Sequence, residues 1–232
     1  DDVSNYSVTS QSSTTASIVK KSLTATATAS NKTYNGDATA STTLSFSGLV
    51  GSETLGQSVS STFNNKNVGT GKTVTVNSIT LSDGSNGGVA SNYSISSGQT
   101  TTANITAKAL TVSGITASNK TYDGNTVVTL DLTGTSYSGL VSGDDVSISA
   151  SGSFDNKNVG TGKTVNISSS YSGSDVGNYS ITDQATTTAN ITASVSGITV
   201  RGITASNKTY DGNNSATLDL SLIHISEPTR RL

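Results

Sequence analysis

The sequence contains no cysteine and no methionine, and His and Pro each occur once in its 232 residues. Without cysteine the chain has neither disulfide bonds nor thiolate metal ligands, so each folded part must be stabilised by its own core. Without methionine, neither a start residue nor a signal peptide can be recognised. We therefore expect an internal fragment of a longer protein.

Charge and long apolar runs are also scarce. Charged residues make up 12% of the chain, and the net charge of −2 gives no electrostatic attraction to nucleic acid or to an anionic membrane. No apolar stretch approaches the roughly 20 residues that a membrane-spanning helix requires. We expect no binding of nucleic acid and no insertion into membranes.

An internal repeat of 88 residues is the main feature of the sequence. SNKTYNG begins at Ser30, and SNKTYDG begins at Ser118 and again at Ser206. NKNVGTGKTV, NYS and TTTANITA recur in the same order between these blocks. A period of this length exceeds the 20 to 50 residues of solenoid repeats, so each repeat is expected to have its own core. The predicted divisions are the end of one repeat at 1–19, whole repeats at 20–107 and 108–195, and the start of another at 196–219.

Apolar and polar residues alternate within each repeat, as in Val128, Leu130 and Leu132. Alternation with period two indicates strands that have one buried face, and turn pairs such as Asp83-Gly84 separate them. The predicted fold class is all-β, with tandem antiparallel β-sandwich-like modules. Only Lys108 and Ala109 separate the last strand of one repeat from the first of the next. Because this connection is short, we expect the modules to form an elongated, semi-rigid rod.

The Tyr-Asp/Asn-Gly triplet occurs once in each repeat. Its three copies are Tyr34-Asn35-Gly36, Tyr122-Asp123-Gly124 and Tyr210-Asp211-Gly212. We interpret them structurally, because Asn-Gly and Asp-Gly supply the positive φ values of a tight hairpin turn. Each tyrosine is then expected to pack at a strand end with its hydroxyl bonded to the backbone. A ligand-binding role for the tyrosines is the alternative interpretation.

The repeated blocks resemble a known family. NKTYDGN, SGLVSGDDVS, FDNKNVGTGKTV, GNYSI and TTANITAKALTVSGITASNKTYDG, in this order, are similar to the YDG repeat of bacterial haemagglutinin-like surface exoproteins. The resemblance covers nearly all of residues 1–219, and it implies a structural or adhesive module of a large secreted adhesin at the bacterial outer surface. The first repeat departs from the pattern at Asn35, which counts against any role that requires a carboxylate there.

Few residues in the sequence are suited to catalysis. VGTGKTV suggests a phosphate-binding loop, but Lys66 and Lys157 stand where that motif requires glycine, so we expect a Gly-rich hairpin instead. No histidine precedes His224 to serve as a base for a nucleophilic Ser or Thr. We therefore predict that the protein is not an enzyme and has no catalytic residues.

Binding of a metal or cofactor also has little support in the sequence. Acidic turns such as Asp144-Asp145, and the single acids Asp83 and Asp175, offer at most a weak Ca²⁺ site, because Ca²⁺ takes six to eight oxygen ligands. No cofactor is predicted. A stabilising isopeptide bond between Lys and Asn side chains is left open.

The leading functional hypothesis is a stalk whose repeats hold a binding tip away from the cell or contribute many weak contacts themselves. The expected partners are the neighbouring repeats and the glycans or proteins of host or neighbouring cells. A carbohydrate-binding repeat that acts through multivalency is the alternative. Ice binding, suggested by threonine runs such as TATATAS, is a third hypothesis.

The C-terminal end departs from the repeat. After TLDL the second repeat continues TGTSYSGL, whereas the chain continues SLIHISEPTRRL after Leu220. Residues 220–232 resemble a translated adapter used in preparing sequencing libraries, and we interpret them as a non-native tail. Resequencing the gene is expected to restore TGTSYSGL-like text at this point.

Overall fold

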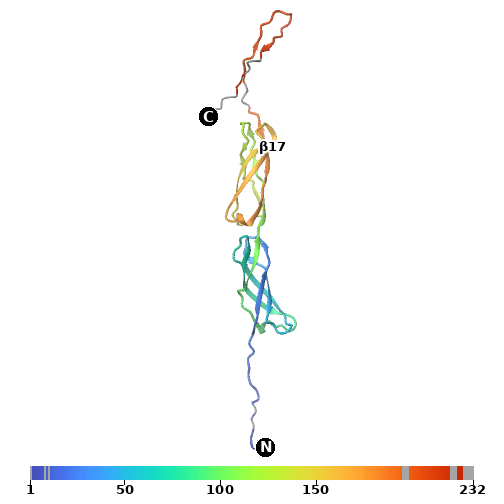
Figure 1. The fold of residues 1–232 in the computed structure, drawn as a ribbon, viewed down its shortest axis with the longest axis vertical. Helices are drawn as coiled ribbons and strands as arrows, with labels where there is room; N and C mark the ends of the chain where they lie inside the picture. The colour runs from blue at the N-terminus through green and yellow to red at the C-terminus, as the bar shows by residue number, and fades with distance from the viewer. Residues whose placement is uncertain (1, 8, 10, 195–198, 220–223, 227–232) are drawn as a thin grey trace. The chain divides into compact units, whose positions relative to one another are not determined.

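Figure 1 shows the computed structural model of the protein, which describes residues 2–7, 9, 11–194, 199–219 and 224–226. Within these residues the regular structure consists of β-strands and three short 3-10 helices, which confirms the all-β prediction. None of the helices that they form has the length and hydropathy of a membrane-spanning segment.

The chain divides into two compact units, and each unit combines several stretches of sequence. Unit 1 comprises residues 1–110, 138–147 and 172–182, and unit 2 comprises residues 111–137, 148–171 and 183–232. Repeat 1 was predicted over 20–107 and repeat 2 over 108–195. Unit 1 therefore holds three segments that the sequence assigns to the second repeat, namely residues 108–110, 138–147 and 172–182.

The strands of the first repeat are short except for two. Their bounds are β1 (Lys21–Ser22), β2 (Thr24–Ala29), β3 (Lys32–Thr33), β4 (Thr39–Ala40), β5 (Thr42–Ser47), β6 (Leu55–Phe63), β7 (Gly69–Asp83), β8 (Tyr93–Ser94) and β9 (Thr100–Thr106). The helix η2 (Ala90–Asn92) precedes β8, and η1 (Asp2–Asn5) lies near the N-terminus.

A five-stranded sheet in the order β3-β9-β7-β6-β4 forms the larger layer of unit 1. β3 pairs with β9 in parallel, and the other neighbours are antiparallel. The antiparallel pair β2–β5 supplies Ala27 and Leu44, which form one buried cluster with Val76 of β7. Alternating residues thus build a core between two groups of strands, as sandwich-like packing requires.

The second repeat forms a matching set of elements. Their bounds are β10 (Lys108–Ser113), β11 (Thr116–Ala117), β12 (Lys120–Thr121), β13 (Val127–Val128), β14 (Leu130–Asp131), β15 (Ser136–Ser138), β16 (Ser147–Phe154), β17 (Gly160–Ser172), η3 (Val176–Asn178), β18 (Tyr179–Thr182) and β19 (Thr186–Thr192).

The sheet of unit 2 has the same strand order as the sheet of unit 1. It runs β12-β19-β17-β16-β13, and its long strand β17 is labelled in Figure 1. Val128, Phe154, Val165, Ala189 and Ile191 form its buried core. Because equivalent sequence blocks form equivalent strands, the 88-residue period is a structural period as well as a sequence period. The remaining sheets are β1-β8, β15-β10-β18, β11-β14, β20-β23 and β21-β22.

The third copy contributes two short strand pairs. β20 (Thr199–Arg201) pairs with β23 (His224–Ser226), and β21 (Thr204–Ala205) pairs with β22 (Leu218–Asp219), both antiparallel. The predicted non-native tail lies outside the described residues except at 224–226. Its origin stays a prediction.

The Tyr-Asp/Asn-Gly segment does not form the hairpin that the sequence suggested. In the first repeat it joins β3 to β4, which lie at opposite edges of the five-stranded sheet. Lys32 bridges these edges, because its Nζ donates to the carbonyl oxygens of Asp37 and Thr39, each at 3.0 Å. Gly36 has φ +89°, but Asn35 does not adopt a positive φ. The hairpin prediction was wrong because β3 and β4 pair with more distant strands.

The second repeated block, NKNVGTGKTV, does form a hairpin, which joins β6 to β7. Residues 64–68 make the turn, so the two glycines that follow lie in β7 and not in the turn. Gly71 has φ +59° at a register shift between β7 and β9, and its N–H donates to Oδ1 of Asn104 at 2.7 Å. The two glycines therefore form an irregularity at the start of β7, directly after the hairpin turn.

Candidate functional site

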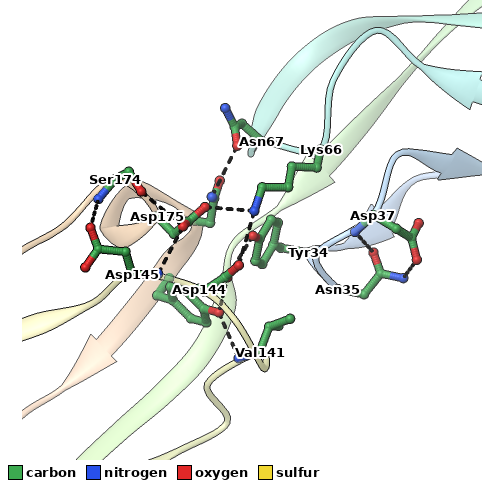
Figure 2. Close-up of polar contacts among 12 residues, drawn as sticks. Tyr34, Asn35, Asp37, Lys66, Asn67, Val141, Asp144, Asp145, Ser174 and Asp175 are labelled. Carbon is green, nitrogen blue, oxygen red and sulfur yellow. Dashed lines mark hydrogen bonds and ion pairs between the residues drawn. The ribbon is translucent and has the colours of Figure 1, made fainter.

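Tyr34 is buried at the end of β3, with 1% of its surface exposed. Its backbone N–H donates to the carbonyl oxygen of Thr106 at 2.8 Å, and its hydroxyl donates to Oδ2 of Asp144 at 2.7 Å. Figure 2 shows the ring beside the loop that carries Asp144. The packing of this tyrosine at a strand end is confirmed, but its expected bond to backbone was wrong, because a carboxylate accepts the proton.

Asp144 lies between β15 and β16 and accepts hydrogen bonds from two tyrosines. Tyr179, the first residue of β18, donates to the same Oδ2 at 2.6 Å, and its hydroxyl accepts from the backbone N–H of Val141 at 3.0 Å. The rings of Tyr34 and Tyr179 meet edge to face, with centroids 5.6 Å apart. Because only 4% of the Asp144 side chain is exposed, its charge needs such partners.

Lys66 supplies the positive charge. It lies in the turn between β6 and β7, and its Nζ is 3.1 Å from Oδ1 of Asp144 and 2.9 Å from Oδ1 of Asp175. The same ammonium group is 5.8 Å from the centroid of the Tyr34 ring, within the range of a cation–π contact. One lysine thus balances two carboxylates that would otherwise repel each other.

An asparagine completes the arrangement. Asn178 is 4% exposed, and its Oδ1 accepts from the backbone N–H of Val68 at 2.9 Å. Its Nδ2 donates to Oδ1 of Asn67 at 3.3 Å. We use the name Tyr34 cluster for Tyr34, Lys66, Asp144, Asp175, Asn178 and Tyr179.

The Tyr34 cluster draws on both whole repeats of the sequence. Tyr34 and Lys66 come from the first repeat, and the other four residues come from the second. All six lie within unit 1, which contains residues 138–147 and 172–182. Side chains that are more than 100 positions apart therefore make one polar network in one compact unit.

The pKa values of the acids show how the network stabilises charge. Burial is the largest influence on the pKa of Asp144 and opposes ionisation, but hydrogen bonds from Tyr179, Tyr34 and Lys66 together outweigh it and lower the pKa. The backbone N–H of Asp145, followed by Lys66, lowers the pKa of Asp175. Both carboxyl groups are accordingly ionised at neutral pH.

The basic and phenolic groups shift in the opposite direction. Hydrogen bonds to Asp175, Tyr34 and Asp144 raise the pKa of Lys66. Burial, followed by the hydrogen bond to Asp144, raises the pKa of Tyr179 to about 12, and the same two causes raise the pKa of Tyr34. At neutral pH the tyrosines are donors and the lysine is a cation, which matches the hydrogen bonds that the network contains.

The other two tyrosines of the triplet have different surroundings. Tyr122 is 37% exposed and Tyr210 is 92% exposed, so the predicted packing of each tyrosine was wrong for these two copies. The triplet acids Asp123 and Asp211 pair with Lys120 and Lys208, each at 2.7 Å. Asn35 instead donates to Oδ2 of Asp37 at 2.7 Å, and Asp37 pairs with Lys32. The second residue of the triplet therefore belongs to a lysine-bound loop and not to the Tyr34 cluster.

The acid half of the cluster is the part that comes from the second repeat, namely Asp144, Asp175, Asn178 and Tyr179. The first repeat contains a counterpart of its acid–tyrosine pair. Glu53 occupies the position of Asp144 and accepts from the hydroxyl of Tyr93, the counterpart of Tyr179. That hydroxyl accepts from the backbone N–H of Val50 at 3.1 Å, as the hydroxyl of Tyr179 does from Val141. Each repeat thus builds its acid–tyrosine pair from its own residues.

The cluster has the chemistry of a structural network. Within the described residues no group of three His, Cys, Asp or Glu side chains is placed to hold a metal ion. Asp144 and Asp175, considered for Ca²⁺, both face Lys66.

Sequence analysis singled out the tyrosine and glycine of the cluster region but missed the residues that hold them. NKN and NYS were recognised as repeated blocks, yet no role was assigned to Lys66, Asn178 or Tyr179. The sequence did contain a usable pattern, because NKN and NYS recur in each whole repeat together with an acid at the third position after SGLV. The spacing of these blocks does not reveal that the NKN block of one repeat contacts the acid of the next.

Comparison with known proteins identifies the repeated unit. A family model described as the YDG domain matches residues 19–103 and 106–189. These ranges resemble the predicted repeats at 20–107 and 108–195. No curated protein and no solved structure matches the chain.

Proposed function

Since this chain belongs to the YDG domain family, we propose that it is a structural and adhesive repeat module, a stalk, of a large secreted or surface-attached bacterial adhesin. The observation that carries the proposal is the Tyr34 cluster, in which a tyrosine and a lysine of one repeat bind the acids of the next. A module of this kind acts by position and number, and its residues do not perform catalysis.

The division into units supports a mechanical role. The chain passes from unit 1 to unit 2, or back, at five points, after residues 110, 137, 147, 171 and 182. A single flexible linker joins domains through one peptide segment and leaves them free to reorient. Here, by contrast, the two repeats are not joined through one segment alone, because parts of the second repeat belong to unit 1.

The burial of Tyr34 removes this ring from the carbohydrate-binding alternative. Sugar-binding platforms present aromatic rings to solvent, and the ring of Tyr34 is enclosed by Lys66 and Tyr179, whereas Tyr122 and Tyr210 are exposed. The chain has no tryptophan to serve instead. Absence of binding of the 232-residue protein on a glycan array is the expected result.

Small-angle X-ray scattering of the 232-residue protein tests the stalk. We expect a pair-distance distribution with a long tail, as elongated particles give. A symmetric distribution typical of a sphere would contradict the proposal. The parent gene supplies a second test, since an upstream signal peptide and secretion domain are expected.

A further inference from the structure

We propose that unit 2 carries a docking surface for the acid-bearing face of a further YDG repeat in the same chain. We call this surface the Tyr122 face and define it as Tyr122, Gly124, Lys157, Asn158 and Val159. Position by position, these residues correspond to Tyr34, Gly36, Lys66, Asn67 and Val68, the residues of the first repeat at and beside the Tyr34 cluster. The inference does not depend on the adhesin role, because it concerns only how repeats join.

Exposure of the Tyr122 face is the first observation. Tyr34 is 1% exposed and Tyr122 is 37% exposed, although both backbone N–H groups donate to the last strand of their sheet at 2.8 Å. Val159 is 54% exposed, whereas its counterpart Val68 is half-buried. The local fold is therefore the same in the two repeats, and the difference is what covers it.

The triplet glycines give a second, independent observation. A methyl group added at Gly36 would lie 2.7 Å from Cγ1 of Val141, so the absence of a side chain there lets Val141 approach. At Gly124, which has nearly the same φ, no atom of the residues that the structure describes lies within 4 Å of that point. Gly124 thus leaves open the space that Val141 occupies beside Gly36.

The acid half of unit 1 shows what the occupant looks like. Tyr93 is 4% exposed and already bonded to Glu53 and Val50, so a repeat forms this half without a donor repeat. Val50 is nevertheless 52% exposed and Asn92 is exposed, whereas their counterpart Val141 is half-buried and Asn178 is buried. An acid half thus forms before docking, and it has exposed apolar and amide groups that the tyrosine and lysine of a preceding repeat could cover.

Charge and period favour the following repeat as the occupant. Lys157 presents a cation where Lys66 meets two carboxylates, so an acidic partner fits it. A third copy starts on the same period at Ser206 and is described as far as Asp219. The position that corresponds to Asp144 would come later in that copy. Completing the repeat would bring a preformed acid half to the Tyr122 face.

The test compares the 232-residue protein with a version in which Asp219 is followed by the sequence of residues 132–195. Tetranitromethane nitrates accessible tyrosines, and peptide mass spectrometry locates the products. Completing the repeat is expected to lower the nitration rate of Tyr122 at least about tenfold, toward that of Tyr34, because modification then requires local opening. An unchanged rate overturns the proposal.

Two variants of the completed protein sharpen the test. Replacing the added counterpart of Asp144 by asparagine is expected to restore much of the reactivity of Tyr122, whereas Asp219→Asn, at the position that corresponds to Asp131, leaves Tyr122 protected. Protection that survives the first change overturns the role assigned to the acid. Protection of Tyr122 that grows with concentration in the 232-residue protein would identify a second copy as the occupant and also overturn the proposal.

An internal control reports folding of the added repeat. Tyr93 is buried without a donor, so the added counterpart of Tyr179 should resist nitration in every variant. A protected acid half beside a reactive Tyr122 contradicts docking directly. An added repeat that stays unfolded contradicts it too, since the same sequence folds in this chain at 108–195.

Discussion

The hydroxyl of Tyr34 donates a 2.7 Å hydrogen bond to Oδ2 of Asp144, which lies 110 residues later in the chain. The tyrosine belongs to one YDG repeat and the aspartate to the next. Because the donor is buried and the acceptor is charged, the bond belongs to the stronger class of protein hydrogen bonds. The repeated sequence supplies matched controls for its contribution.

Removing the Tyr34 hydroxyl should destabilise the protein. Tyr34→Phe deletes a hydrogen bond to a charged acceptor, and such bonds contribute about 1.5–3 kcal/mol. Tyr122→Phe is the matched control, because within the described residues no partner lies in hydrogen-bonding range of the Tyr122 hydroxyl. Urea unfolding should show a loss for Tyr34→Phe and a change below about 0.5 kcal/mol for the control. Equal losses would contradict the assignment.

Removing the Lys66 ammonium should be more damaging than removing its counterpart. Lys66→Met retains much of the side-chain volume but leaves Asp144 and Asp175 without the cation between them. Lys157→Met removes an exposed lysine of the same sequence block. We expect a lower thermal unfolding midpoint only for the first variant. A midpoint unchanged by Lys66→Met would show that solvent already screens the two acids.

The two triplet glycines should differ in their tolerance of alanine. Both have positive φ, so each alanine pays backbone strain of about 1–2 kcal/mol. Gly36→Ala also brings a methyl group 2.7 Å from Val141, and overpacking of this kind adds about 1–3 kcal/mol. Urea unfolding should therefore show the larger loss for Gly36→Ala. Adding Val141→Ala should remove the excess, and a failure to do so would argue against the contact.

These repeats should be most stable between mildly acidic and mildly alkaline pH. The pKa values of Asp144 and Asp175 are lowered in the folded state, so their contribution is present above the unfolded value near 4 and is lost as pH falls below it. The pKa of Tyr179 is raised to about 12, so its contribution is present below about 10 and is lost as pH rises from there toward 12. The midpoint of urea unfolding, measured across this pH range, checks the predicted losses of stability at acidic and at alkaline pH.

Asp144→Asn provides the control for the loss of stability at acidic pH. Asparagine does not titrate, so the loss of stability below about pH 4 should be smaller in this variant than in the unmodified protein. An identical loss at acidic pH would assign the effect to other carboxyl groups, such as the exposed Asp37.

The sequence allowed the repeat and the strand content to be predicted, because alternation and period depend on local residue order. It predicted the same packing for all three triplet tyrosines, but only Tyr34 is buried, because its covering residues come from another repeat. The hairpin at Asn35-Gly36 was predicted wrongly, since β3 pairs with β9, more than 70 residues later, and local turn preference cannot reveal such a partner. The acceptor of Tyr34 was missed for the same reason. Asp144 was noted only as a turn acid, and its role depends on a contact with another repeat.

The most direct test is a double-mutant cycle of Tyr34→Phe and Asp144→Ala, with the free energy of unfolding measured for each variant. If one repeat is held by the next through this pair, the two losses should be non-additive, with a coupling energy of about 1 kcal/mol or more. Losses that add within about 0.3 kcal/mol would contradict the account, because the two side chains would then act independently.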